Sequence, residues 1–358
     1  MAVSASGEVN TLLIEKFNGT VHLEYGKGEN LLGRYDVQEV VGTNMVSNKY
    51  LGGTEVHRMV AGSDPEATPT RADKNALVVD TMILARNTVA HLHDVQNDFE
   101  TKNRLAKNQV VKLKQVEDQM VLQQNLSGAL TGGAYDGSTI TGGVKRIDNS
   151  DHGVAIKMEI TPAQAKDPVA LGAAIELVIE GLIIQRTPIS NLSIIVPIQE
   201  YGRLVDYQYI AKQQGGSNEA MGLDMEAMSG RWNSFNIGIT GSTEFTQMRI
   251  NPKLDKDGHH PLSTVDNGYR YDVTADMQLA SAIVTGRDAL LCGRTIGLST
   301  DIFKDKKTKT FYIDSWIAEG AIPDRYDNIG AVFKTAGVEN VTVKEKADGK
   351  AVLTRALA

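Results

Sequence analysis

The stretch HLHD at residues 91–94 contains the side chains with the clearest potential for metal chemistry. On an extended strand His91 and His93 lie on one face, as the ligands of a metal ion can, and Asp94 follows them directly. No other His, Cys or acidic cluster is paired with them by spacing, although a zinc site takes about four ligands. We therefore interpret HLHD as the polar end of a strand and expect no bound metal. A metal-dependent hydrolase that uses His91, His93 and Asp94 is kept as an alternative.

The remaining reactive side chains have no partners that would give them a catalytic role. Cys292 is the only cysteine, and its apolar surroundings in ALLCGRT predict a buried structural thiol in a reducing compartment. His259 and His260 stand beside Pro261 in a turn and are expected to be solvated. The sequence contains no phosphate loop, no nucleophile elbow and no HExxH zinc motif. We expect neither an enzyme nor a cofactor.

Charge and hydropathy exclude several classes of partner. The chain has 358 residues and carries 37 Lys and Arg against 44 Asp and Glu, a net charge of −7, which argues against tight binding to nucleic acid or an anionic membrane. The N-terminus has no signal-peptide pattern, and no apolar run approaches the roughly 18 residues of a membrane span. A hydrophobic content of 41% is enough for a core, so we expect a soluble, folded chain.

Residues 51–80, LGGTEVHRMVAGSDPEATPTRADKNALVVD, have no helical period. Val56, Arg58 and Val60 alternate as on an extended chain, and residues 77–79 resemble a second strand. The polar segment between them has nothing to bury. The pattern predicts a long hairpin with a polar tip, and because a lone hairpin is marginal in water, the hairpin marks a functional projection.

Residues 97–127 change to a helical period. Apolar residues from Phe99 to Met120 recur at helical spacing, there is no Gly or Pro from Phe99 to Ser127, and Gly128 is expected to stop the helix. The narrow apolar stripe predicts a helix of about 40 Å that lies across a surface. A basic cluster on it could contact nucleic acid, but a solvated face is the favoured interpretation. The polar positions expected to be solvated are Lys102, Arg104, Lys107, Lys112, Lys114, Glu117 and Asp118.

The second half of the chain predicts core helices over a mixed sheet. Asp167 is the expected N-cap of a core helix at 167–186, with Pro168 at its first position. The other expected elements are a buried strand at 191–197, a helix after Pro197, a strand at 230–242, a turn-rich insertion at 251–268, a strand–turn–strand at 301–317 and a hairpin in the tail. The sum is an α+β fold.

In this order the elements resemble those of a tailed-bacteriophage major capsid protein of the Hong Kong 97 fold, with the greatest similarity to the short-tailed phages of the T-seven group. Residues 47–98, beginning SNKYLGGTEVHR, resemble the extended loop and the strand after it. FETKNRLAKNQVVKLKQVEDQMVLQQNLSGAL resembles the spine helix. LSIIVPIQEYGRLVD with GRWNSFNIGITGSTEF resembles the axial core, and WIAEGAIPDRYDNIGAVF resembles the closing segment.

The resemblance implies a division into parts. These are an N-terminal arm at 1–44, an extended loop at 45–82, a peripheral domain at 83–165 and 286–321 with the spine helix at 97–127, an axial domain at 166–285 and 322–336, and a C-terminal tail at 337–358. The insertion at 251–268 and the tail have no counterpart in the family.

The resemblance also implies a function. The chain would assemble with itself into hexamers and pentamers of an icosahedral shell in the host bacterial cytoplasm and become the capsid of the virion. The implied partners are scaffold and portal proteins and double-stranded DNA, which is held weakly and non-specifically. The resemblance implies no membrane partner. The Lys–Asn pair of a covalently linked shell is not matched here. An encapsulin-like compartment is the alternative with the same fold.

The hairpin at 51–80 is the expected contact between copies. It has no apolar face broad enough to fold back on its own domain, and its tip carries both signs of charge, so we expect it to lie over a neighbouring subunit. The candidate contact residues are Arg58, Asp64, Glu66, Arg71, Asp73 and Lys74.

Overall fold

The structure is a computed structural model. It describes residues 30–53, 56–58, 62, 72–90, 100–145, 153–206, 210–211, 227–232, 234–305, 310–335, 341–345 and 351–355. The HLHD stretch and three of the predicted contact residues, Asp64, Glu66 and Arg71, lie outside these ranges.

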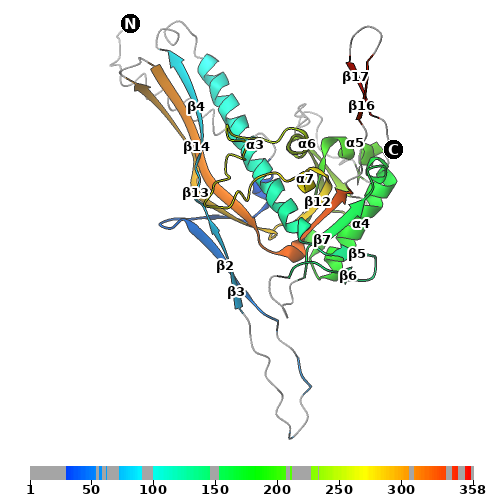
Figure 1. The fold of residues 1–358 in the computed structure, drawn as a ribbon. Helices are drawn as coiled ribbons and strands as arrows, with labels where there is room; N and C mark the ends of the chain where they lie inside the picture. The colour runs from blue at the N-terminus through cyan, green and yellow to red at the C-terminus, as the bar shows by residue number, and fades with distance from the viewer. Residues whose placement is uncertain are drawn as a thin grey trace.

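A four-stranded sheet forms one side of the molecule (Figure 1). Its strands, in spatial order, are β1 (Val37–Glu39), β13 (Leu290–Asp305), β14 (Thr310–Pro323) and β4 (Ile83–Ala90). β1 runs parallel to β13, and the other pairs are antiparallel. The two strands predicted within 301–317 are confirmed, and both extend well beyond that range, while the predicted turn at 306–309 lies outside the described residues. Cys292 is fully buried on β13, as predicted.

A seven-stranded mixed sheet forms the second part. Its strands, in spatial order, are β7 (Ile156–Ile160), β15 (Ile329–Lys334), β12 (Ala280–Gly286), β8 (Leu192–Pro197), β11 (Gly238–Ser242), β10 (Ala227–Trp232) and β9 (Ile210–Ala211). The prediction of a strand entered by a turn at 230–242 is confirmed for β11 but wrong at its start, where residues 230–232 already belong to a strand. Residues 230–242 contain the end of β10, a turn with Asn236 at φ 55°, and β11, which pairs with β10. β7 belongs to this sheet through its parallel pairing with β15.

Helices cover both faces of the seven-stranded sheet. Ile195, Ile283 and Ala331 face the long helix α3 (Glu100–Leu130) and α6 (Thr243–Ile250), whereas their neighbours in sequence face α4 (Pro168–Ile184) and α5 (Ile198–Asp206). Because both faces are buried, these strands are apolar at consecutive positions. Asp167 accepts a hydrogen bond from Val169 N at 3.1 Å with Pro168 at the first position of α4, which confirms the predicted N-cap.

The helix α3 ends later in the sequence and is more buried than predicted. It continues through Gly128 to Leu130, and a Cβ at Gly128 would lie 2.8 Å from Ile329 Cδ1, so this glycine permits close packing rather than ending the helix. The prediction of a solvated helix face is wrong for the second half of α3, where Lys114, Glu117 and Asp118 are all buried. The reason is that α3 lies between the two sheets, and α6 packs on it too.

The start of the described chain is also part of the core. Leu31 and Leu32 are buried against α3, and Leu31 N donates to Asp118 Oδ1 at 2.9 Å. With β1 paired to β13, residues 31–39 pack on the body of the molecule.

Several smaller elements also occur within the described ranges. They are four 3-10 turns at Leu32–Arg34, Gln164–Lys166, Ile189–Asn191 and Tyr326–Asn328, the strands β5 (Ala134–Tyr135) and β6 (Ile140–Thr141), the helix α7 (Ala275–Gln278), and the tail strands β16 (Val341–Glu345) and β17 (Ala351–Arg355). β16 and β17 pair antiparallel, which confirms the predicted tail hairpin. No helix in the described ranges has the length and hydropathy needed to cross a membrane.

The prediction that His260 is solvated is wrong. His260 lies in the connection between α6 and α7, residues 251–274, and is completely buried. Burial lowers the pKa of its imidazole to about 4. The connection packs on α3, where Lys253 N donates to Gln119 Oε1 at 2.9 Å, so its turn-rich sequence does not place it in solvent.

Candidate functional site: the projecting hairpin

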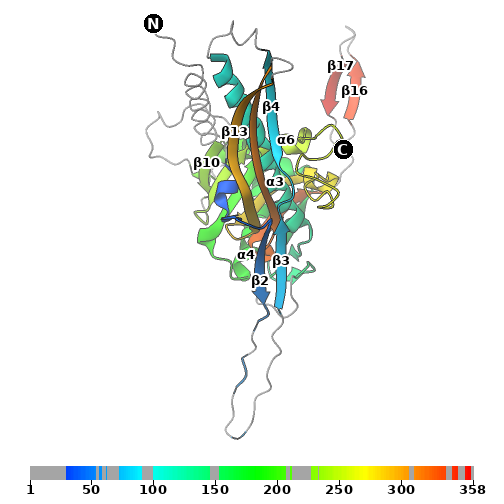
Figure 2. The same cartoon turned by 90° about the vertical axis from the view of Figure 1, so that its left-hand side faces the viewer.

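A two-stranded hairpin projects from the body at one end of the four-stranded sheet (Figures 1 and 2). It consists of β2 (Met45–Leu51) and β3 (Ala72–Val78), paired antiparallel from Met45↔Val78 to Leu51↔Ala72. The predicted hairpin is confirmed, but its first strand was predicted too late in the sequence. Val56 and Arg58 lie outside any strand and are exposed.

The base of the hairpin packs on its own domain. Val46, Leu77 and Val79 are at most 8% exposed and form a cluster with residues of β13 and β14 that includes Ala318. A Cβ at Gly293 would lie 2.7 Å from Val46 Cγ2, so the glycine allows the hairpin to approach the sheet closely. The prediction that the hairpin has no apolar face for its own domain is therefore wrong at the base. Burying each such side chain contributes about 1.5–3 kcal/mol.

A polar clamp fixes the hairpin two residue pairs further out. Asn48 and Asn75 are directly paired across β2 and β3. Asn48 Nδ2 donates to Asp324 Oδ2 at 2.9 Å, and Asn75 Nδ2 donates to Asp324 Oδ1 at 2.6 Å and to Pro323 O at 3.1 Å. Asp324 is only 4% exposed and directly follows β14. Hydrogen bonds to an ionised carboxylate are about twice as strong as neutral ones, so both strands are tied to one buried anion.

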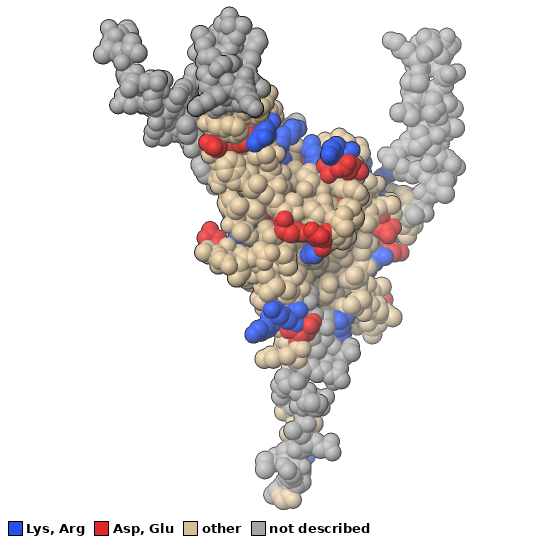
Figure 3. All heavy atoms as spheres, turned by 60° about the vertical axis from the view of Figure 1, so that its left-hand side comes forward, with Lys and Arg blue, Asp and Glu red and all other residues tan. Residues whose placement is uncertain are grey.

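The opposite face of the hairpin is exposed. Lys49 and Lys74 lie directly across from each other on it, and like charges in that arrangement destabilise a strand pair. Apolar Leu51, which is 66% exposed, extends the same face. Figure 3 shows charged side chains of both signs gathered at the base of the hairpin, below a body surface that is mostly neither acidic nor basic. This face has both apolar surface and charge available for a partner.

The described contact candidates, Arg58, Asp73 and Lys74, are all exposed on or beyond the hairpin. The residues that position it, Asn48, Asn75 and Asp324, were not predicted, although the alternation in MVSNKYL indicates a strand with Asn48 on the face of Val46 and Tyr50. Among the described residues no three His, Cys, Asp or Glu side chains come together as metal ligands.

A largely buried pair of ionisable side chains, Arg294 and Glu319, lies between α3 and the sheet. Arg294 and Glu319 are directly paired across β13 and β14. Arg294 Nε and Nη2 each donate to Glu319 Oε2 at 3.1 Å. Burial raises the pKa of the Glu319 carboxyl well above its usual range, and the nearby Glu117 raises it further, while Arg294 acts in the opposite direction. The protonated form of Glu319 is therefore favoured in the folded chain.

Comparison with known proteins gives a match at the level of fold alone. No model of a known protein family matches the sequence, and neither does any curated protein. The fold is the Hong Kong 97 fold of phage capsid proteins, with its extended loop and its spine helix, α3. The mature capsid of bacteriophage PhiM1 matches with a TM-score of 0.59 and 15% identity over 85% of this chain and 86% of that one. The capsid of the cyanophage P-SCSP1u matches with a TM-score of 0.61 and 13% identity over 87% and 89%.

Proposed function

We propose that this chain is a phage major capsid protein that assembles into hexamers and pentamers of an icosahedral shell around double-stranded DNA. The observation that carries the proposal is the similarity to two capsid structures over at least 85% of each chain. The protein is then a structural component of the virion, not an enzyme. It assembles in the host bacterial cytoplasm with scaffold and portal proteins, and its phage belongs to the short-tailed, T-seven-like group.

The same proposal divides the molecule between two roles. The four-stranded sheet with α3 is the peripheral domain, and the seven-stranded sheet with α4 and α5 is the axial domain. The hairpin β2–β3 and the segment beyond it lie over a neighbouring copy, with Arg58, Asp64, Glu66, Arg71, Asp73 and Lys74 as contacts. A single exposed ion pair is worth about 0–1 kcal/mol, but the contact is repeated around every ring.

Electron microscopy of the expressed protein, with its scaffold protein if one is required, tests the proposal. Closed particles that take up double-stranded DNA when portal and packaging proteins are supplied are the expected result. A chain that stays monomeric under all such conditions contradicts the proposal. Particles that enclose only a protein cargo would indicate the encapsulin-like alternative.

A replacement within the hairpin tests the role of its outer part. Residues 54–70 are exchanged for a short Gly-Ser turn, which keeps β2, β3 and the clamp on Asp324. We expect a folded subunit with an unchanged circular dichroism spectrum that no longer closes into shells. A variant with Arg58→Glu and Lys74→Glu should assemble less well than the wild type, with a marked dependence on salt. Normal shells from the shortened chain would exclude the proposed contact.

A further inference from the structure

The connection between α6 and α7 presents large apolar side chains to solvent. Leu254 is 51% exposed, Val265 is 75% exposed and Tyr269 is 39% exposed. We call these three residues the connection patch. Contacts within one loop connect the segments that carry them. Asp255 N donates to His259 O, the rings of His259 and Tyr269 stack at 4.3 Å, and Gly268 N donates to Val265 O. Apolar groups gathered on one exposed loop indicate an interaction surface.

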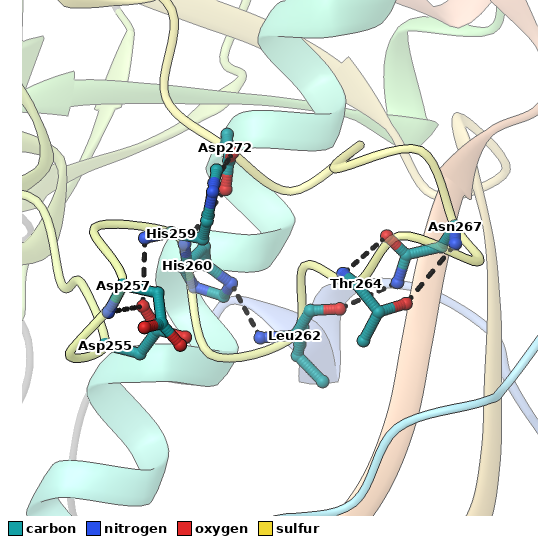
Figure 4. Close-up of polar contacts among 8 residues, drawn as sticks. All are labelled: Asp255, Asp257, His259, His260, Leu262, Thr264, Asn267 and Asp272. Carbon is teal, nitrogen blue, oxygen red and sulfur yellow. Dashed lines mark hydrogen bonds and ion pairs between the residues drawn. The ribbon is translucent and has the colours of Figure 1, made fainter.

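The loop that carries the patch is held rigidly by polar contacts (Figure 4). Asp255 Oδ1 accepts from the backbone N of Asp257 at 2.9 Å and of His259 at 3.0 Å. Asp272 Oδ1 accepts from His260 N at 2.9 Å, and its Oδ2 lies 2.6 Å from His259 Nδ1. Both ends of the loop are therefore joined to its middle.

The second half of the loop is fixed in the same way. Asn267 Oδ1 accepts from Thr264 N at 2.9 Å, and Asn267 Nδ2 donates to Leu262 O at 2.8 Å (Figure 4). Tyr269 has a φ of 53°, a conformation that is strained for an aromatic residue. The network holds Tyr269 in this strained conformation with its side chain partly exposed. A surface ordered before binding loses little entropy when a partner binds.

The connection is anchored to the root of the hairpin as well as to α3. Thr264 Oγ1 donates to Asp80 Oδ2 at 3.3 Å, and Asp80 lies between β3 and β4. On the other side, Gln124 Nε2 of α3 donates to Arg270 O at 3.0 Å. The patch is thus continuous in structure with the element proposed to contact a neighbouring copy.

The charges around the patch favour a protein partner over a polyanion or a lipid surface. The connection carries residues of both charges, which are Lys253, Lys256 and Arg270 against Asp255, Asp257, Asp266 and Asp272. Apolar side chains surrounded by both signs of charge are typical of a protein–protein contact, whereas a nucleic-acid or anionic-membrane site requires an excess of cations.

We propose that the connection patch binds a second copy of this chain, adjacent to the hairpin contact. The inference rests on the proposed shell function. It gives a role to the insertion that has no counterpart in the family. The patch is already ordered in the single subunit. We expect the contact to be lateral, between subunits of one ring or of adjoining rings.

A Val265→Cys variant tests the inference, because the only native cysteine, Cys292, is fully buried and does not compete for a thiol reagent. Unassembled subunits are labelled at residue 265 with a bulky maleimide and then placed under assembly conditions. We expect the unlabelled variant to assemble like the wild type and the labelled variant to give at least tenfold fewer particles. The matched control is Lys112→Cys, an exposed position on α3, labelled in the same way.

The outcomes separate this inference from the proposed function. Labelled Val265→Cys subunits that assemble with wild-type yield overturn the inference and leave the shell function intact. A wild type that never assembles overturns the shell function itself. Equal loss of assembly in the labelled Lys112→Cys control would show that any bulky label blocks assembly, and would count against a specific contact at Val265. Circular dichroism of each labelled subunit checks that the fold is retained.

Discussion

Asn75 Nδ2 lies 2.6 Å from Asp324 Oδ1, although the two residues are 249 positions apart in the sequence. This hydrogen bond joins the projecting hairpin to the end of β14, and its cross-strand neighbour Asn48 donates to the other oxygen of the same carboxylate. The orientation of the hairpin is thereby set by a few polar atoms beside its packed base.

Replacing Asn75 with Ala should weaken both the subunit and its assembly. The change removes a hydrogen bond to a charged group, which costs about 1.5–3 kcal/mol in the free energy of unfolding. Urea unfolding of the unassembled subunit measures the loss, and particle yield measures the effect on assembly. Asn75→Asp should be worse, because it places a second carboxylate against Asp324.

The adjacent exposed Lys74→Ala serves as the stability control and should stay within about 0.5 kcal/mol of wild type. Equal stability of Asn75→Ala and wild type would contradict the clamp.

Leu113→Asp should prevent folding of the peripheral part of the chain. Leu113 is 2% exposed, and a buried unpaired charge costs several kcal/mol against a net stability of about 5–15 kcal/mol. Lys112→Ala, at the neighbouring exposed position, should change stability by no more than about 0.5 kcal/mol. Soluble yield and thermal unfolding followed by circular dichroism distinguish the two. If Leu113→Asp folded and Lys112→Ala did not, the assignment of the helix faces would be wrong.

The buried His260 should make the chain less stable in acid. Burial holds the pKa of its imidazole at about 4, against about 6.5 when exposed, even though Asp272 and Asp255 favour the charged form. The unfolded chain therefore binds the extra proton first as pH falls. The contribution of His260 to stability is complete above pH 6.5 and is lost progressively down to pH 4, by about 3 kcal/mol.

His260→Gln isolates this contribution. The variant should lose less stability than the wild type between pH 7 and pH 4.5, as measured by urea unfolding at each pH. The comparison depends on the change with pH and not on absolute stability, so a general destabilisation by the substitution does not obscure it. Parallel pH profiles of variant and wild type would show that the pKa of His260 does not differ between the folded and unfolded chain, and would contradict the prediction.

Glu319 should have the opposite dependence on pH. Burial raises the pKa of its carboxyl in the folded chain, so the folded state binds the proton more tightly than the unfolded state. The stabilising contribution is present below the ordinary carboxyl pKa and is lost as pH rises through the raised value. Glu319→Gln keeps an oxygen that can accept from Arg294 but carries no charge. In thermal melts across a pH series, its stability should fall less than that of the wild type as pH rises from the ordinary carboxyl pKa through the raised value.

Local patterns in the sequence were sufficient for much of the fold. The N-cap at Asp167, the helical spacing from Phe99 to Met120 and the apolar strand around Cys292 depend on residues a few positions apart, so the sequence predicts them directly. The resemblance to phage capsid proteins rested on the order of such elements, and the structure has the same fold.

The tertiary structure alone decided which polar residues are buried and which residues meet. Lys114, Glu117 and His260 are of residue types that usually lie on a solvated surface, but segments distant in the sequence cover them. Asn48, Asn75 and Asp324 form the clamp only because β14 ends beside the root of the hairpin. Burial of a side chain and contact between distant residues depend on which elements pack together over the whole chain. Periodicity within one segment reports only the preferences of that segment, and this is why the sequence predicted the hairpin but not what holds it.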